Sequence, residues 1–167
     1  VERYAHQTKG VNSLITYGTP HMGIYLSWIE FKKLEYWKDP FDFDTYLANN
    51  DFLVYLDNEK PHTHMAQYRS NLLSLNHFLI AWSSIDSVIY PIESSKFEFY
   101  NISLAEERNT LEVVPLDQSE YYKHDALGLR TLNSSGRLTI KEFSCKHEEF
   151  KHPKCYDGSL MNNTLIV

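Results

Sequence analysis

The sequence predicts an α/β fold in which a mainly parallel sheet is flanked by helices. Three apolar segments have the length and composition of buried strands: residues 11–17, 78–82 and 138–143. Segments with helical spacing of apolar residues separate the first two. This alternation favours parallel strands joined by right-handed crossovers, because a strand can return in parallel only through a long connection. We therefore expect one domain built on these strands.

Loops with polar residues follow all three predicted strands. The first loop begins at Gly18 and contains His21, Asp86 lies just past the second strand, and His147 lies four residues beyond the third. Parallel strands place such loops at one edge of the sheet, where ligands and catalytic groups gather. By spacing alone, a turn-capping carboxylate is the simpler interpretation of Asp86, and a core histidine is the usual interpretation of His147. An acid and then a histidine after successive strands also predict a catalytic Asp–His pair.

Composition limits the classes of function. The chain has 167 residues, of which 43% are hydrophobic and 23% charged, and no apolar run reaches the ~20 residues of a membrane span. The formal net charge of −6 argues against a nucleic-acid partner, because phosphate binding requires clustered Lys and Arg. The sequence begins at Val1 rather than Met, which suggests that it is a cut piece. We expect no cofactor and no metal.

The remaining elements are predicted from local signals. Expected helices are the end of a helix over 1–8, a core-facing helix over 24–37, a short helix capped by Asn50 or Asp51, a helix over 65–75, and a helix start at 117–120. Expected extended pieces are 97–100 and 110–116, and residues 133–136 form a turn.

Cysteines and sequons bear on the cellular compartment. Cys145 and Cys155 lie ten residues apart, so they could form a disulfide in an oxidising compartment or remain two unrelated thiols. Three Asn-x-Ser/Thr sequons, at Asn101, Asn133 and Asn162, lean toward the secretory route as glycosylation sites. A third interpretation is a zinc site, in which His147 and His152 join the two cysteines as ligands.

Several stretches resemble one enzyme family. They are VNSLITYGTPHMGIY, LEYWKDPFDFDTYLANNDFLVYLDNE, YRSNLLSLNHFLIAWSSIDSVIYPIESSKFEFY and YYKHDALGLRTLNSSGRLTIKEFSCKH. The Tyr-Trp-x-Asp-Pro block, the Asp-x-x-x-x-Pro block followed by Phe-x-Phe-Tyr, and the Leu-Gly-Leu-x-x-Leu block are specific together. The chain resembles the palmitoyl-protein thioesterases over about residues 10–150, and more closely their second, lysosomal branch.

The resemblance implies the C-terminal part of an α/β-hydrolase fold with its front portion missing, and a helical insertion or lid over 24–75. It implies a lysosomal hydrolase that cleaves long-chain fatty acyl thioesters, such as palmitoyl-cysteine or palmitoyl-CoA. Asp86 would be the acid of a Ser-His-Asp triad and His147 its general base. Gly18, His21 and Met22 would contact the acyl substrate.

The sequence also departs from the family pattern. It contains no Gly-x-Ser-x-Gly, the motif that carries the nucleophile in α/β-hydrolases. We therefore expect a fragment that is inactive alone. The alternative from another class of function is a catalytically inactive secretory glycoprotein that retains an acyl-binding or partner-binding surface.

Overall fold

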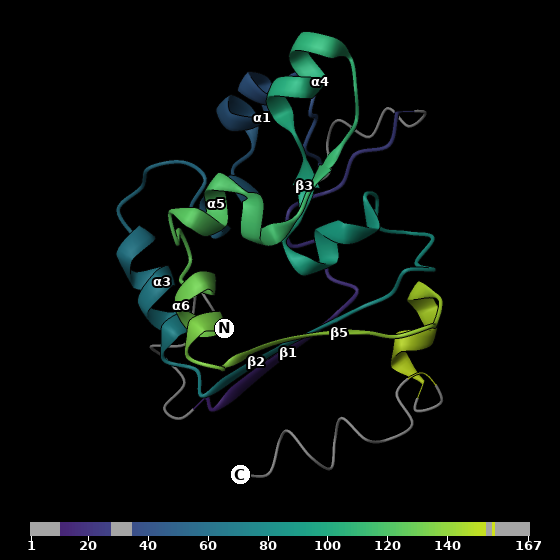
Figure 1. Cartoon of the computed structure of the whole chain (residues 1–167). Coiled ribbons are helices and arrows are strands. Elements are labelled where there is room, and N and C mark those ends of the chain that lie inside the picture. The colour runs from purple at the N-terminus through teal and green to yellow at the C-terminus, as the bar shows by residue number, and fades with distance from the viewer. Residues whose placement is uncertain (1–10, 28–34, 153–154, 156–167) are drawn as a thin grey trace.

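A three-stranded parallel sheet lies at the base of the computed structural model, which describes residues 11–27, 35–152 and 155 (Figure 1). Its strands are β1 (Ser13–Tyr17), β2 (His77–Trp82) and β5 (Leu138–Glu142), in the order β1-β2-β5. Both pairings are parallel, with Ser13 opposite His77 and Phe78 opposite Leu138. The predicted strands and their parallel arrangement are confirmed, with small differences at the strand ends.

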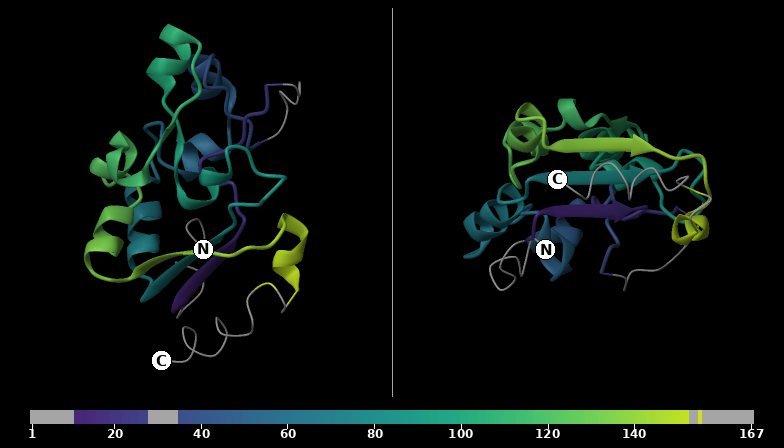
Figure 2. Two further views of the ribbon diagram at one scale, coloured as in Figure 1. Left: turned by 45° about the vertical axis from the view of Figure 1, so that its right-hand side comes forward. Right: turned by 90° about the horizontal axis from the view of Figure 1, so that it is seen from below.

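The alternation of side chains along β2 divides the core into two parts. Phe78 and Ile80 point into the larger cluster. That cluster includes leucines such as Leu72 and Leu132 from the helices that cover one face of the sheet, which we call the helical layer. Leu79 and Ala81 point to the other face, where they join a smaller cluster. Figure 1 shows the helices α1 to α6 on one side of the sheet, and Figure 2 shows the three strands side by side from the opposite side. Because β2 is central and buried on both faces, its amino-acid sequence is a continuous run of apolar residues.

The remaining elements are short and lie mostly in the helical layer. The helices are α1 (Phe43–Asn49), α2 (Leu53–Leu56), α3 (Met65–Leu73), α4 (Ile102–Arg108), α5 (Glu120–Lys123) and α6 (Leu129–Ser134). The described residues also form the 3-10 helices η2 (Ile92–Lys96), η3 (Leu116–Gln118) and η4 (His147–Lys151). The strand β3 (Phe99–Tyr100) pairs in antiparallel fashion with β4 (Val113–Val114). Among the described residues, no helix is long and apolar enough to cross a membrane.

The helix predicted over 24–37 is wrong for the residues that the structure describes. Ile24 and Trp37 instead form an isolated parallel bridge, in which Ile24 N donates to the Tyr36 carbonyl and Lys38 N donates to the Ile24 carbonyl. Tyr25 packs against Trp37 with ring centroids 5.3 Å apart. Tertiary contact between the ends of the segment thus overrides the helical spacing of its aromatic residues. Residues 28–34 and the helix end predicted over 1–8 lie outside the described residues.

Other local signals were interpreted more successfully. The helix predicted over 65–75 is α3. The N-cap of α2 is Phe52 rather than Asn50 or Asp51, although Asn50 Oδ1 accepts from the backbone N–H groups of Phe52 and Val54 just before and within the first turn. Sequence reasoning missed α4, although Asn101 caps it by accepting from Leu104 N. An Asn before a run of helix-forming residues is the signal that could have found it. Region 24–75 contains α1 to α3, and its role as a lid stays a prediction.

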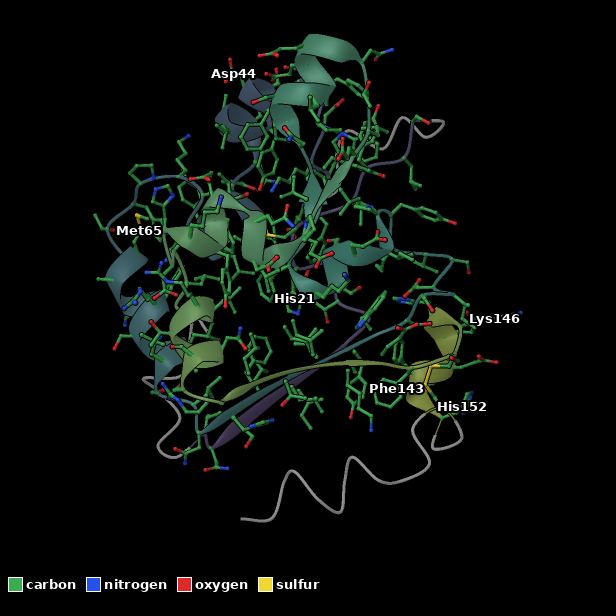
Figure 3. The ribbon with its side chains drawn as sticks, in the orientation of Figure 1. His21, Asp44, Met65, Phe143, Lys146 and His152 are labelled. Carbon is green, nitrogen blue, oxygen red and sulfur yellow. A yellow bond between two sulfur atoms is a disulfide. The ribbon has the colours of Figure 1, made fainter. Side chains whose placement is uncertain are left out.

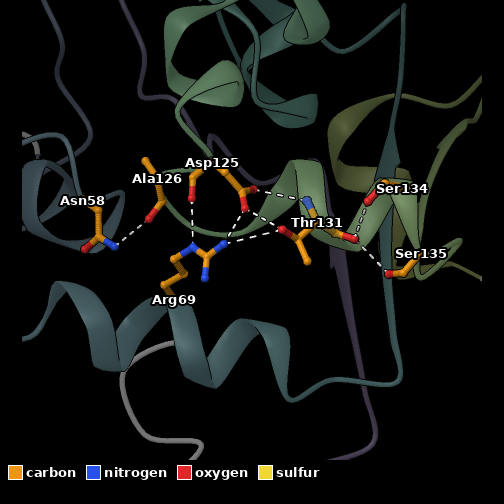
Figure 4. Close-up of polar contacts among 7 residues, drawn as sticks. All are labelled: Asn58, Arg69, Asp125, Ala126, Thr131, Ser134 and Ser135. Atoms are coloured by element: carbon orange, nitrogen blue, oxygen red, sulfur yellow. Dashed lines mark hydrogen bonds and ion pairs between the residues drawn. The ribbon is translucent and has the colours of Figure 1, made fainter.

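A polar cluster around the buried Asp125 carboxylate fastens α3 to the segment before α6 (Figure 4). Arg69 donates to the Asp125 carbonyl and forms an ion pair with the Asp125 carboxylate. Thr131 donates to both oxygens of that carboxylate through its N–H and its hydroxyl. Burial acts to raise the pKa of Asp125, but the hydrogen bonds from Thr131 and Arg69 outweigh it and the pKa is lowered. The cluster therefore holds an ionised carboxylate in place beside the sheet.

Candidate active site

The structure brings Asp86 and His147 together beyond the carboxyl ends of β2 and β5. His147 Nδ1 lies 2.8 Å from Asp86 Oδ2. The Asp86 side chain is almost fully buried, whereas 32% of the His147 side chain is exposed. A carboxylate can only accept, so Nδ1 carries the proton and Nε2 carries the lone pair. The pair thus combines a buried acid with a solvent-facing base.

Asp86 also caps its own loop. Its Oδ1 accepts from Val88 N at 2.8 Å and from Ile89 N at 3.1 Å, while Oδ2 faces His147. The turn-capping role and the pairing role are therefore both present, one on each carboxylate oxygen. The two backbone hydrogen bonds fix the direction in which Oδ2 points, and this orients the imidazole.

Gly18 packs directly against the pair. Its φ is +48°, and a Cβ added there would lie 3.2 Å from both Asp86 Oδ2 and His147 Nδ1, and 3.0 Å from the ring of Phe150. Gly18 N donates to the carbonyl of Ala81, which anchors the loop to β2. Gly18 therefore packs against the acid and the base, and its contact with the substrate, which the family resemblance implies, stays a prediction. Only a glycine gives the backbone this close approach.

A hydrogen bond from Ser83 joins the Asp86 loop to the His147 segment, and a disulfide closes that segment. Ser83, which is buried, donates through Oγ to the Cys145 carbonyl at 2.6 Å and accepts from Ile85 N at 3.2 Å. Cys145 forms a disulfide with Cys155, and this closes the loop that contains His147. Sequence reasoning did not identify Ser83 as a supporting residue. Its position directly after a buried strand is the signal that could have drawn attention to it.

The disulfide overturns the zinc interpretation. Zinc binds thiolates, and both sulfur atoms are joined to each other. His147 faces Asp86, and in the part of the chain that the structure describes no group of three or more His, Cys, Asp or Glu side chains could hold a metal ion. Figure 3 shows Phe143, Lys146 and His152 gathered with this disulfide at the end of the sheet.

His21 and Met22 are both buried, with 8% and 6% of their surface exposed. His21 stacks on Phe97 with centroids 4.2 Å apart and shares a hydrogen bond of 2.9 Å with Thr16 Oγ1. Burial lowers the pKa of His21 to about 3, so the ring is neutral. Figure 3 shows His21 between the sheet and the helical layer, and Met22 belongs to the main hydrophobic cluster. Contact of these two residues with the substrate stays a prediction.

The sequons fall in different surroundings. Asn101 is half-buried at the start of α4, and Asn133 is exposed near the end of α6, where its Nδ2 donates to Tyr122 Oη. Asn162 lies outside the described residues. Glycosylation at these positions stays a prediction.

The parallel sheet with flanking helices, and an acid and a histidine that meet beyond its carboxyl edge, define an α/β-hydrolase-type protein. The sequence profile described as "Palmitoyl protein thioesterase" matches residues 29–147. That match covers well over half of the chain, so the chain belongs to the palmitoyl protein thioesterase family. The fold class and the family resemblance read from the sequence are confirmed.

Individual relatives agree with the family profile. Palmitoyl-protein thioesterase 3 of Dictyostelium discoideum is 42% identical over 119 residues, which cover 71% of this chain and 38% of the relative. Human lysosomal thioesterase PPT2 is 30% identical over 180 aligned residues, which cover 93% of this chain and 56% of the relative. Palmitoyl-protein thioesterase 1 of Caenorhabditis elegans is 28% identical and covers 75% of this chain and 41% of the relative. The chain spans about half the length of these relatives.

Proposed function

We propose that this chain carries the acid and the general base of a thioesterase that hydrolyses long-chain fatty acyl thioesters by a Ser-His-Asp mechanism. The observation that carries the proposal is the 2.8 Å contact between His147 Nδ1 and Asp86 Oδ2. A carboxylate on Nδ1 holds the imidazole in the tautomer in which Nε2 accepts a proton. His147 is the residue of this pair with solvent access.

In this mechanism His147 transfers protons and Asp86 stabilises the charged form of the His147 imidazole. His147 Nε2 removes the proton from a serine hydroxyl as the serine oxygen bonds to the thioester carbonyl carbon. The carbon–sulfur bond then breaks, and the thiolate takes the proton from His147. A water molecule, deprotonated by the same Nε2, then bonds to the acyl carbon. The bond between that carbon and the serine oxygen breaks, the serine oxygen takes the proton back from His147, and the fatty acid leaves. Asp86 stabilises the imidazolium at each stage. The serine comes from a part of the relatives' length that the 167 residues do not span.

An acyl substrate is supported by apolar surface beside the pair. Ile85 and Val88 flank Asp86 in sequence and are 52% and 49% exposed, although both are large apolar side chains. Each methylene of a fatty chain that leaves water for such a surface contributes about 0.8 kcal/mol. The names of the relatives, which are thioesterases, point the same way.

A lysosomal or other lumenal location is part of the proposal. The human relative is named a lysosomal thioesterase. The Cys145–Cys155 disulfide is typical of an oxidising compartment, and three sequons accompany it. Cleavage of N-linked glycans from protein secreted by eukaryotic cells should lower its apparent mass. Unchanged mass after that treatment would remove the support from the sequons.

The catalytic role is tested in a full-length protein that carries this chain. His147→Ala should lower kcat for a palmitoyl thioester by on the order of 10³-fold or more, and Asp86→Asn should also be severe because the imidazole then adopts the wrong tautomer. His152→Ala, at an exposed side chain near the same 3-10 helix, is the matched control and should keep full activity.

Two outcomes would contradict the proposal. Full activity of the His147→Ala protein would show that the base lies elsewhere. A folded full-length protein without any turnover would favour the alternative function, an inactive glycoprotein that retains an acyl-binding or partner-binding surface.

A further inference from the structure

A cavity of about 530 Å³ lies in the helical layer, among β3, α1, α4 and α5. We refer to it as the aromatic cavity, because its apolar wall consists largely of rings: Phe43, Phe97, Phe99, Tyr100 and Tyr121, together with Met22. Neither Asp86, His147 nor Gly18 contributes to its lining. Its size falls within the range of small-molecule sites, about 300–1,000 Å³.

Neighbouring rings hold the wall in a fixed shape. Phe97 stacks on Tyr121 with an interplanar angle of 9°, and Phe43 stacks on Tyr46 at 27°. Phe99 and Tyr100 are in edge contact, with ring centroids 5.2 Å apart. A wall that is already ordered loses little conformational entropy when a ligand binds, and this favours affinity.

The charges in the wall cancel one another. Lys38 is buried with 2% of its side chain exposed, and its Nζ forms an ion pair with Glu59 Oε1. Lys38 Nζ also lies 4.7 Å from the centroid of the Phe99 ring. The other Glu59 oxygen accepts from Tyr46 Oη, and burial together with Glu59 raises the pKa of Tyr46, so that its hydroxyl keeps its proton. The wall therefore offers no uncompensated positive charge to an anionic ligand.

The rim of the aromatic cavity is polar and has no uncompensated charge. Asn101, Ser103 and Gln118 line it and provide neutral amide and hydroxyl groups. Glu120 lines it as well, and its carboxylate is paired with Lys123 Nζ at 2.9 Å. Neutral and paired rim groups suit a neutral polar head, because an anionic head would find no free positive charge there.

We propose that the aromatic cavity binds an uncharged amphiphile with a hydrocarbon body and a neutral polar head, at a site separate from the Asp86–His147 pair. The hydrocarbon body packs against the rings, and the head accepts hydrogen bonds at the rim. A medium-chain methyl ester such as methyl decanoate has the required chemistry. At roughly 30 Å³ per heavy atom, the share of one water molecule in the liquid, it occupies about 400 Å³ and fits.

Methionine methyl NMR of the 167-residue chain tests the proposal. Met22 lies in the wall of the aromatic cavity, whereas Met65, at the start of α3, does not line it and is an internal reference. Titration with methyl decanoate should shift the Met22 resonance in a saturable manner and leave Met65 unchanged. Decanoate, which differs in charge, should bind at least tenfold more weakly.

Variants separate this site from general surface binding and from the proposed active site. Ile102 lines the cavity, so Ile102→Trp should reduce its volume and abolish the Met22 shift, whereas Ile140→Trp on β5 should not. His147→Ala should leave binding unchanged, so the outcome does not depend on the thioesterase role. Equal shifts of Met22 and Met65, undiminished binding to Ile102→Trp, or equal affinity for decanoate would each overturn the proposal.

Discussion

Gly18 is the residue on which the Asp86–His147 geometry depends most directly. Gly18→Ala should destabilise the protein, because its φ of +48° is strained for alanine and the new methyl group would crowd three side chains at 3.0–3.2 Å. Gly136→Ala is a matched control, since Gly136 also has a positive φ, +70°, but its Cβ would meet no atom within 4 Å. The difference between the two variants in urea unfolding isolates the contact, and should be about 1–3 kcal/mol.

A spectroscopic measurement tests whether Gly18→Ala disturbs the hydrogen bond between Asp86 and His147. The proton between His147 Nδ1 and Asp86 Oδ2 should give a far-downfield ¹H resonance, and Gly18→Ala should weaken it while Gly136→Ala leaves it intact. Equal stability of the two variants and an unchanged resonance would mean that Gly18 does not position the pair.

His21 should make stability depend on pH. Burial lowers the pKa of His21 to about 3, whereas an unfolded histidine has a pKa of about 6.5. The unfolded state therefore binds more protons between these values, and stability falls as pH falls through that window, by up to about 1.4 kcal/mol per pH unit. His21→Gln should flatten the dependence measured by urea unfolding from pH 7.5 to pH 4.5. His152→Gln, at an exposed side chain, should leave it unchanged; if His21→Gln does the same, the ring is not buried as described.

At the scale of elements, Ser83 couples the loop after β2 to the segment after β5. Ser83→Ala removes a buried hydroxyl that makes two hydrogen bonds and leaves the Cys145 carbonyl without its donor. Such a loss costs about 1–3 kcal/mol. In the full-length protein, kcat should fall several-fold with little change in KM, because His147 is less well held while substrate contacts remain. Ser84→Ala, at the exposed neighbour, is the control. Equal behaviour of the two variants would remove the coupling role from Ser83.

At the scale of the whole molecule, the two faces of the sheet are stabilised by different means. The helical layer covers one face with a large apolar cluster, whereas the described part of the other face relies on a small cluster around Phe143 and Phe150. Cys145 belongs to this small cluster and Cys155 packs against it, so the disulfide between them lies within the cluster. It therefore compensates for limited burial on that side.

Removal of the disulfide should reveal its contribution. Cys145→Ser combined with Cys155→Ser should lower the free energy of unfolding by about 2–3 kcal/mol, because a closed loop of this length restricts the unfolded chain. Reductant should destabilise the natural chain by a similar amount and leave the double variant unaffected. A natural chain whose urea midpoint is insensitive to reductant would contradict the prediction.

The sequence by itself determined the strands and the order of the candidate catalytic residues. Apolar runs of strand length are local signals, and they located β1, β2 and β5; the positions of Asp86 and His147 beyond strand ends followed from them. The helix predicted over 24–37 was wrong at the ends that the structure describes, residues 24–27 and 35–37, and α4 was missed. In the first case a contact between Tyr25 and Trp37 decided the local structure, and in the second a single capping residue was the main signal.

Only the tertiary structure decided which residues support the pair. The hydrogen bond from Ser83 to the Cys145 carbonyl joins residues that are 62 positions apart. Gly18 lies near the start of the described residues and packs against His147, which lies near their end. The sequence left the two cysteines open between a disulfide and free thiols, and the structure joins them in a disulfide. Contacts of this kind depend on how separate elements pack, since local propensity acts only over a few neighbouring residues and carries no information about a partner so distant.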